Sequence, residues 1–251
     1  MKRLIYLFLL CIGLQTFAQL NDNFSSSKAE FNTRWIGDTN AFQLIDETLK
    51  LNAPLNQNKV NISRCFPDTN SIRLELICSL DFSPSASNRL QLYLTENEDL
   101  QNGYYLQIGE NGSNDAIDCY RIINGNSNLI ISGIAKRIAT NFDLLELSFI
   151  LNDSLQLHSI LPGETLKQEF SIIRTDTLKL NCFSITCNYT STRSTKFTFD
   201  DFKITPLEFN PKTSIKEPNT NYYFSKVHDL SFTELMIDPT PKRFLPEAEF
   251  I

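Results

Sequence analysis

The sequence predicts an all-β sandwich or jelly roll, because its hydrophobic residues alternate, its composition favours strands and its turns are short and polar. The alternation is clearest in residues 72–80, where Ile72, Leu74 and Leu76 are separated by charged residues, as in a strand buried on one face. The 251 residues include 19 Phe and 8 Tyr, which are favoured in strands. Asn, Ser and Thr are abundant and favour the turns between strands.

Further alternating runs follow along the chain, and each is expected to form a strand. These runs are residues 90–94, 104–108, 117–121, 145–151, 155–157, 183–189 and 196–204. The last run changes phase across Asp200 and Asp201, which predicts a β-bulge. Asn111 and Gly112 are expected to form a tight hairpin turn between residues 104–108 and 117–121. No amphipathic helix of useful length is expected.

The N-terminus is predicted to be a signal peptide. Lys2 and Arg3 give a positive start, residues 4–14 are almost wholly apolar, and Ala18 ends a motif of the kind that signal peptidase cleaves. We therefore expect residues 1–18 to be removed, and the protein to be secreted or held at the cell surface. No other run approaches the roughly 20 apolar residues of a membrane helix.

The mature chain has an odd number of cysteines, which leaves at least one thiol unpaired. Cys182 and Cys187 would lie on opposite faces of one strand, so a bridge between them is geometrically poor. We expect several buried free cysteines in preference to a disulfide framework. Zinc is not expected, because no two cysteines have C-x-x-C spacing. The five cysteines are Cys65, Cys78, Cys119, Cys182 and Cys187.

Seven short motifs occur in order in the first four-fifths of the chain. They are residues 23–24 (NF), 34–39 (RWIGDT), 49–53 (LKLNA), 102–110 (NGYYLQIGE), 112–117 (GSNDAI), 187–191 (CNYTS) and 194–202 (STKFTFDDF). Together they resemble the concanavalin-like, laminin-G-like sandwich domains of secreted proteins from Gram-negative bacteria. The resemblance implies a concanavalin-like jelly-roll sandwich over residues 19–206, in which the first and last strands lie side by side.

A different pattern follows the sandwich. Residues 207–228 contain Pro211 and Pro218, follow Pro206 directly and are expected to be a stiffened linker. Residues 229–251 resemble the start of a lamin-tail domain, an immunoglobulin-like sandwich, through the motif at 232–241 (FTELMIDPTP), although Thr233 stands where that family has Asn. So short a segment cannot close such a sandwich. We therefore expect the sequence to be a fragment of a longer protein or a truncated product.

Composition and motifs argue against catalysis and against nucleic-acid binding. The net charge of −6 opposes binding of duplex nucleic acid by charge alone, and only two histidines occur, His158 and His228. Concanavalin-like folds include glycoside hydrolases, but the close acidic spacing that places their two carboxylates together is absent. Residues 96–99 (ENED) are the densest acidic run and are expected to be a solvated turn. We predict that the protein is not an enzyme.

Asp200 and Asp201 are candidate calcium ligands, because hard cations prefer carboxylate and carbonyl oxygens. The resemblance to calcium-bearing sandwich domains supports this hypothesis, with Asp22 as a neighbour on the first strand. The alternative is that the acidic pair deters aggregation at a sheet edge. We favour the alternative, because the sequence places no second acidic cluster beside the pair.

Tyr93, Tyr105 and Tyr120 are candidate sugar-binding residues, because aromatic rings pack against the apolar faces of sugars. Tyr104 and Tyr105 are adjacent and must point to opposite faces of a strand. Alternation predicts that Tyr104 faces the core and Tyr105 faces outward. We expect Trp35 to lie in the core, and the alternative for the other rings is that they also fill it.

Together these observations predict an exported, non-catalytic binding or adhesion module at the cell surface or in extracellular material, with an extracellular glycan or a surface protein as partner. Two alternatives stay open. The chain could be an accessory, non-catalytic region of a larger secreted hydrolase, or a structural spacer of a surface protein. The sequence gives no oligomeric state.

Overall fold

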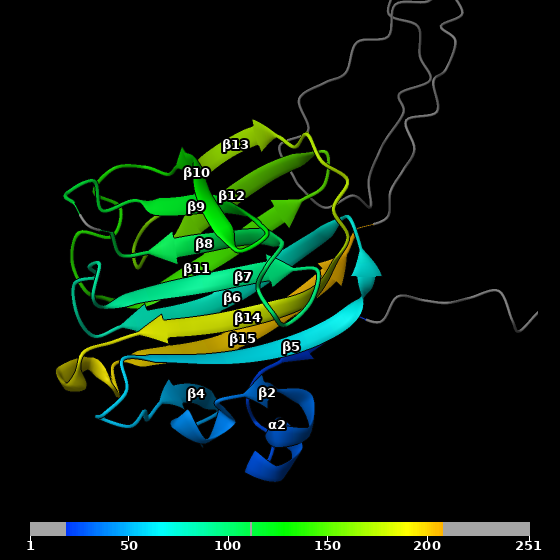
Figure 1. Ribbon diagram of the computed structural model, residues 1–251. Helices are drawn as coiled ribbons and strands as arrows, with labels where there is room; N and C mark the ends of the chain where they lie inside the picture. Colours follow the sequence, from blue (N-terminus) through cyan, green and yellow to red (C-terminus); the bar gives the residue numbers. More distant parts are fainter. Residues whose placement is uncertain (1–18, 111, 208–251) are drawn as a thin grey trace, which may run out of the picture. The chain divides into compact units, whose positions relative to one another are not determined.

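The computed structural model describes residues 19–207 except residue 111, and these residues form two antiparallel β-sheets packed face to face (Figure 1). One sheet, here called sheet A, has the first and last strands of the domain side by side. Its order is β13 (Lys167–Ile173), β12 (Ser154–Ile160), β11 (Phe142–Leu151), β6 (Ile72–Leu80), β15 (Phe197–Pro206), β4 (Thr48–Leu51) and β3 (Phe42–Ile45), with β1 (Leu20–Asp22) also paired to β15.

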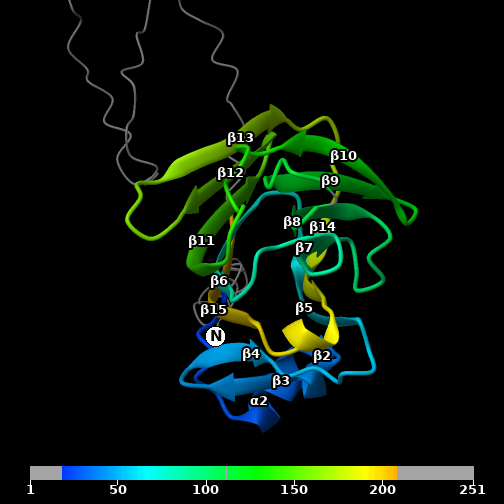
Figure 2. The same ribbon diagram turned by 90° about the vertical axis from the view of Figure 1, so that its left-hand side faces the viewer.

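The second sheet, sheet B, faces the viewer in Figure 1. Figure 2 shows the two sheets from the side as separate layers, with β10 and β13 at one edge of the sandwich and β2, β3 and β4 at the other. The order of sheet B is β10 (Asn126–Ser132), β9 (Ile117–Ile123), β8 (Gly103–Ile108), β7 (Arg89–Thr95), β14 (Leu180–Asn188), β5 (Lys59–Thr69) and β2 (Ile36–Gly37).

The hydrophobic core lies between the two sheets and follows the predicted alternation. In β6, the residues Ile72, Leu74, Leu76, Cys78 and Leu80 are buried, whereas the residues between them are half-buried. This is the pattern of a strand that packs one face against the other sheet. The prediction of an all-β sandwich is confirmed for the described residues.

The pairing of the first and last strands is also confirmed. Asp22 of β1 lies opposite Phe202 of β15, in antiparallel register. The register of β15 against β6 shifts between Asp200 and Lys203, so the predicted bulge is present. Asp201, within this bulge, has a left-handed φ of 47°.

A short helix, α2 (Lys28–Arg34), was not expected. Its start is nevertheless encoded locally, because Ser27 and Glu30 form a reciprocal capping box at its N-terminus. The helix buries Phe31, whose ring stacks on Trp35 with centroids 5.9 Å apart. Trp35 is buried, as predicted.

The tight hairpin turn lies at a different Asn-Gly pair from the one expected. β9 and β10 are joined by Asn124 and Gly125, which have φ values of 49° and 77°, as a two-residue type I′ turn requires. The connection between β8 and β9 instead runs from residue 109 to residue 116. Gly112 in that connection does not have a left-handed φ, and residue 111 is outside the described part.

The cysteines correct one expectation and confirm another. Cys65 of β5 and Cys182 of β14 lie directly opposite each other and form a disulfide, although a disulfide was not favoured from the sequence. The sequence could not show this bridge, because it depends on the register between two strands whose cysteines are 117 residues apart in the chain. Cys78, Cys119 and Cys187 are buried and free, as expected.

Three predicted segments lie outside the described residues: the signal peptide at 1–18, the linker beyond Leu207 and the lamin-tail segment at 229–251. The structure therefore leaves these predictions untested. Within the described part, no helix is both long enough and apolar enough to cross a membrane.

Reduction of the Cys65–Cys182 bridge is expected to lower the free energy of unfolding by up to about 4 kcal/mol, because the bridge closes a long loop in the unfolded chain. Urea unfolding with and without a reductant measures the difference. The double variant Cys65→Ala/Cys182→Ala is the control, and its stability should not respond to the reductant. A wild-type stability that is equally insensitive would contradict the prediction.

Candidate functional site

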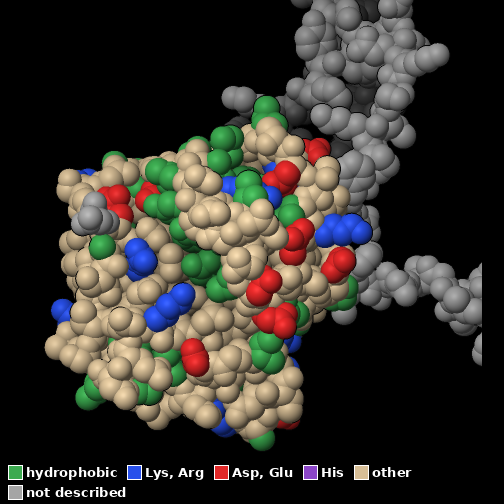
Figure 3. Space-filling view, viewed as in Figure 1, with side chains coloured by type: hydrophobic (Ala, Val, Ile, Leu, Met, Phe, Trp, Pro, Cys, Tyr) green, Lys and Arg blue, Asp and Glu red, His purple; other side chains and the backbone are tan. Residues whose placement is uncertain are grey.

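The three candidate tyrosines lie side by side on the outer face of sheet B. Tyr93 of β7 lies opposite Tyr105 of β8, which lies opposite Tyr120 of β9. The ring centroids of Tyr93 and Tyr105 are 4.8 Å apart, and those of Tyr105 and Tyr120 are 4.7 Å apart with nearly parallel planes. We call this set the tyrosine row. Figure 3 shows this face, and hydrophobic side chains gather over the region of β8 to β10.

The outward orientation of the tyrosine row follows from strand alternation. Tyr104 belongs to the core cluster between the sheets, and its hydroxyl donates to Asp176 Oδ2 at 2.6 Å. Tyr105 belongs to a separate cluster with Tyr93, as the sequence predicted. A shift of one residue in either strand would have reversed this arrangement.

The tyrosine row presents little free ring face to solvent. Tyr93 and Tyr105 are only 8% and 6% exposed; the Tyr105 ring is stacked between Tyr93 and Tyr120, and the Tyr93 ring stacks on Tyr105. Tyr120 is half-buried and, within residues 19–207, no further ring stacks on its other face. Burial raises the pKa of all three phenols, so their hydroxyls stay protonated and can donate hydrogen bonds at neutral pH.

A second row of side chains, here called the polar row, runs parallel to the tyrosine row across the same strands. Gln91 Nε2 donates to Gln107 Oε1 at 3.0 Å, and Thr186 Oγ1 donates to Asn61 Oδ1 at 2.7 Å. Strand register places these residues in a continuous line that ends in β9. The polar row consists of Asn61, Thr186, Gln91, Gln107 and Asp118.

Asp118 is the one acidic member of the polar row. It is 3% exposed, and its Oδ1 atom has no hydrogen-bond partner among the described residues. Burial raises the pKa of its carboxyl group, Ser132 lowers that pKa through a hydrogen bond, and Glu110 raises it. The sequence analysis missed Asp118, although its alternation with Ile117 and Cys119 could have placed it on the outer face.

The structure does not bring the three candidate calcium ligands together. Asp22 is buried, with its Oδ2 atom 2.9 Å from Trp35 Nε1 and 3.0 Å from Arg64, while its Oδ1 accepts from the backbone of Phe24. Arg34 lies 3.5 Å from the same Oδ2 atom. Both carboxylate oxygens are thus occupied by hydrogen-bond donors, which does not fit a cation ligand.

Asp200 and Asp201 lie at the bulge of β15, apart from this ion pair. Asp201 is exposed, and its backbone N–H donates to Asp200 Oδ1 at 2.8 Å. In the described part of the chain, no three carboxylates hold their oxygens within 4.8 Å of one another. The pair therefore has no third carboxylate with which to form a calcium site.

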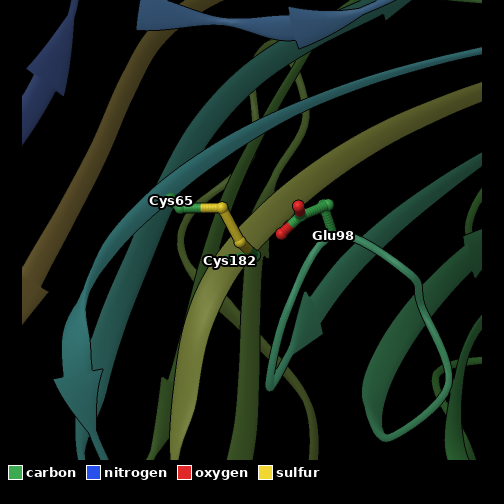
Figure 4. Close-up of side chains that lie close together, drawn as sticks. All are labelled: Cys65, Glu98 and Cys182. Carbon is green, nitrogen blue, oxygen red and sulfur yellow. A yellow bond between two sulfur atoms is a disulfide. The ribbon is translucent and has the colours of Figure 1, made fainter.

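The acidic run at residues 96–99 forms the connection between β7 and β8, in agreement with the predicted turn. Glu98 of this connection lies beside the Cys65–Cys182 bridge, and Figure 4 shows its carboxylate directed toward the sulfur atoms. The sequence could not reveal this contact, because the three residues come from distant parts of the chain.

No known protein family and no curated protein matches the sequence. Among solved structures, the exoplasmic/lumenal domain of VIP36 in its Ca2+/Man2-bound form has a TM-score of 0.56 and 12% identity, over 77% of this chain and 90% of that chain. This similarity shows that the two domains share a fold. The part of the chain that the structure describes has a concanavalin-like β-sandwich fold.

The same sandwich also resembles part of an enzyme. The xylan β-1,4-xylosidase from Bacillus halodurans C-125 has a TM-score of 0.52 and 13% identity, over 74% of this chain and 38% of that chain. At these identities the likeness concerns the fold alone. The ligand of the sandwich must be argued from its side chains.

Replacing the buried carboxylate Asp22→Asn is expected to lower the free energy of unfolding by about 3–5 kcal/mol, because it leaves the Arg64 charge buried without its partner. Urea unfolding measures the change. Asp46→Asn, at an exposed turn, is the matched control and should change stability little. If Asp22→Asn lowered the free energy of unfolding no more than Asp46→Asn does, a structural role for the ion pair would be ruled out.

Replacing Asp118→Asn is expected to stabilise the protein by about 1 kcal/mol at pH 7. The variant removes a buried negative charge whose Oδ1 atom has no hydrogen-bond partner among the described residues. The folded-state pKa is raised, so the wild-type protein is penalised above that pKa and recovers as the pH falls through it. The advantage of the variant should therefore shrink toward pH 4. Thermal melts across this pH range test the prediction, with the exposed Asp143→Asn as control. A variant that is less stable than the wild type at pH 7 would refute it.

Proposed function

We propose that this chain is an exported, non-catalytic module that binds extracellular glycans through the outer face of sheet B. The observation that carries the proposal is the tyrosine row lying directly beside the polar row on β7, β8 and β9. Sugars combine apolar ring faces with many hydroxyl groups, so their binding sites pair aromatic rings with amide and carboxylate groups.

The two rows supply complementary contacts. The tyrosine hydroxyls donate and accept hydrogen bonds, and Tyr120 offers its uncovered ring face for packing against a sugar. Gln91 and Gln107 form part of a hydrogen-bonded chain with Asn188, which donates to Gln91 Oε1 at 3.0 Å. This chain fixes the orientation of the amide groups, and a fixed orientation lowers the entropic cost of binding.

The solved structures lend this proposal support of a general kind. The VIP36 domain was crystallised with mannose-containing ligands, and the xylosidase acts on xylan, so related sandwiches occur in proteins that handle carbohydrates. The xylosidase also favours the alternative that this chain is an accessory region of a larger secreted hydrolase. Whether the chain is an independent module or an accessory region of a hydrolase, we propose that the sandwich binds carbohydrate.

Calcium has no part in the proposed sugar site. Asp22 is held in the ion pair with Arg64, and Asp200 and Asp201 lie on sheet A, whereas the tyrosine row lies on sheet B. A cation at the bulge of β15 would therefore be separate from the sugar. We expect binding to persist in a chelator.

The test is an array of mannose-, glucose- and xylose-based oligosaccharides, followed by calorimetry on the sugars that bind. Tyr120→Ala is expected to weaken binding at least about tenfold, because it removes the one uncovered ring face. Leu166→Ala, an exposed apolar residue between β12 and β13 of sheet A, is the control and should leave affinity unchanged. Binding no higher than background for the wild-type protein would overturn the function, and loss of binding in chelator would overturn its independence from calcium.

A further inference from the structure

Three metal-ligating side chains meet at one end of the outer face of sheet B. The Sγ atoms of Cys65 and Cys182 and a carboxylate oxygen of Glu98 all lie within 4.8 Å of one another. Figure 4 shows the Glu98 carboxylate directed at the bridge from the connection between β7 and β8. We call these three residues the thiol cluster. It is separate from the tyrosine row and plays no part in the proposed sugar site.

The backbone holds the two cysteines opposite each other independently of the bridge. Cys65 and Cys182 are direct partners in the pairing of β5 with β14, and their Cα atoms are 4.0 Å apart. The next outward-facing pair, Ser63 and Ser184, is joined by a hydrogen bond of 2.7 Å. The two sulfurs therefore stay close together when the covalent bond between them is broken.

The connection that carries Glu98 is also fixed. Thr95 Oγ1 donates to the carbonyl oxygen of Asn97 at 2.6 Å, and the backbone N–H of Glu96 donates to the carbonyl oxygen of Asn102 at 3.0 Å. Gly125, at the tip of the β9–β10 hairpin, donates to the carbonyl oxygen of Gln101 at 2.9 Å. These bonds hold Glu98 in place over the bridge.

The thiol cluster is accessible, and its carboxylate is available. Cys65 and Glu98 are exposed to solvent, whereas Cys182 is buried. Glu98 forms no hydrogen bond or ion pair with any described residue. A carboxylate so placed is free to accept a cation, unlike that of Asp22.

We propose that reduction of the Cys65–Cys182 bridge opens a binding site for a thiophilic divalent cation such as Zn2+, with both sulfurs and the Glu98 carboxylate as its protein ligands. Two thiolates and one carboxylate suit zinc, which accepts sulfur at about 2.3 Å and oxygen at about 2.0–2.2 Å. Atoms bound to one such ion lie at most about 4.6 Å apart, and the Glu98 carboxylate oxygen lies within 4.8 Å of both sulfurs. Water would complete a tetrahedral site.

The oxidation state of the bridge decides whether the site exists. A disulfide has no thiolate to offer a metal, so the oxidised cluster provides only Glu98. A phosphine reductant cleaves the S–S bond, the two sulfurs gain two electrons and two protons, and the phosphine becomes its oxide with an oxygen atom from water. Zn2+ then displaces the two thiol protons as the two Zn–S bonds form.

The test is titration of the phosphine-reduced protein with Cd2+, which binds thiolates and gives a sulfur-to-cadmium absorption band, followed by competition with Zn2+. One ion per chain is expected for the reduced protein and none for the oxidised protein. Glu98→Gln is expected to weaken binding at least about tenfold, because it removes one ligand but leaves the sulfurs in place. Glu96→Gln, on the same connection but outside the thiol cluster, is the matched control.

The three free cysteines require a control of their own. Cys65→Ser/Cys182→Ser keeps Cys78, Cys119 and Cys187 and should show no absorption band. A band that persists in this variant, unchanged affinity in Glu98→Gln, or equal binding by the oxidised protein would each overturn the proposal. A higher melting temperature of the reduced protein in the presence of Zn2+ would support it independently of the absorption measurement.

Discussion

Strand register in sheet B is the constraint on which every outward-facing feature of this sandwich depends. The pairing of β14 with β5 and β7 sets three parallel lines of side chains across the sheet: the polar row, the tyrosine row with Ser63 and Ser184 in line with it, and the cysteine pair. A slip of one residue would turn each line into the core. The disulfide joins β5 and β14 at one of these lines, whereas Tyr93, Tyr105 and Tyr120 are aligned by the pairing of β7 with β8 and of β8 with β9. The bridge and the candidate sugar site thus depend on different strand pairings of the same sheet.

A second constraint ties the two sheets together. Asp22 belongs to β1 in sheet A and Arg64 to β5 in sheet B, so their ion pair crosses the interior of the sandwich. Burial of both charges is costly, and the Coulomb attraction alone does not offset it. Hydrogen bonds from Trp35 and from the backbone of Phe24 satisfy the remaining lone pairs of the carboxylate. The chain start is held against the closing strand by this network, which explains why an acidic residue of the first strand serves packing and cannot serve a cation.

Sequence reasoning succeeded where the relevant information is local. Alternation within one strand was enough to place Tyr104 inside and Tyr105 outside, and a change of phase was enough to locate the bulge at Asp201. It failed where two distant segments must be aligned, as for Cys65 and Cys182, because register between strands depends on bulges and connections along the whole path. β10 was missed for a different reason: it lies at an edge and is exposed on both faces, so it carries no alternation to detect. The neighbouring contact of Glu98 depends on the same long-range alignment.

The packing of the tyrosine row changes what kind of sugar contact this face can make. An isolated tyrosine on a sheet presents its ring face, but here Tyr93 and Tyr105 stack on neighbouring tyrosines and are almost fully buried. Binding through such a row must rely on hydrogen bonds with a definite direction, with ring packing confined to Tyr120 at its end. Because the polar row runs beside it with its amides already fixed by hydrogen bonds, the proposed site would recognise the orientation of sugar hydroxyl groups. If the proposed function holds, selectivity among neutral sugars follows from the alignment of these two rows more than from the amount of apolar surface they offer.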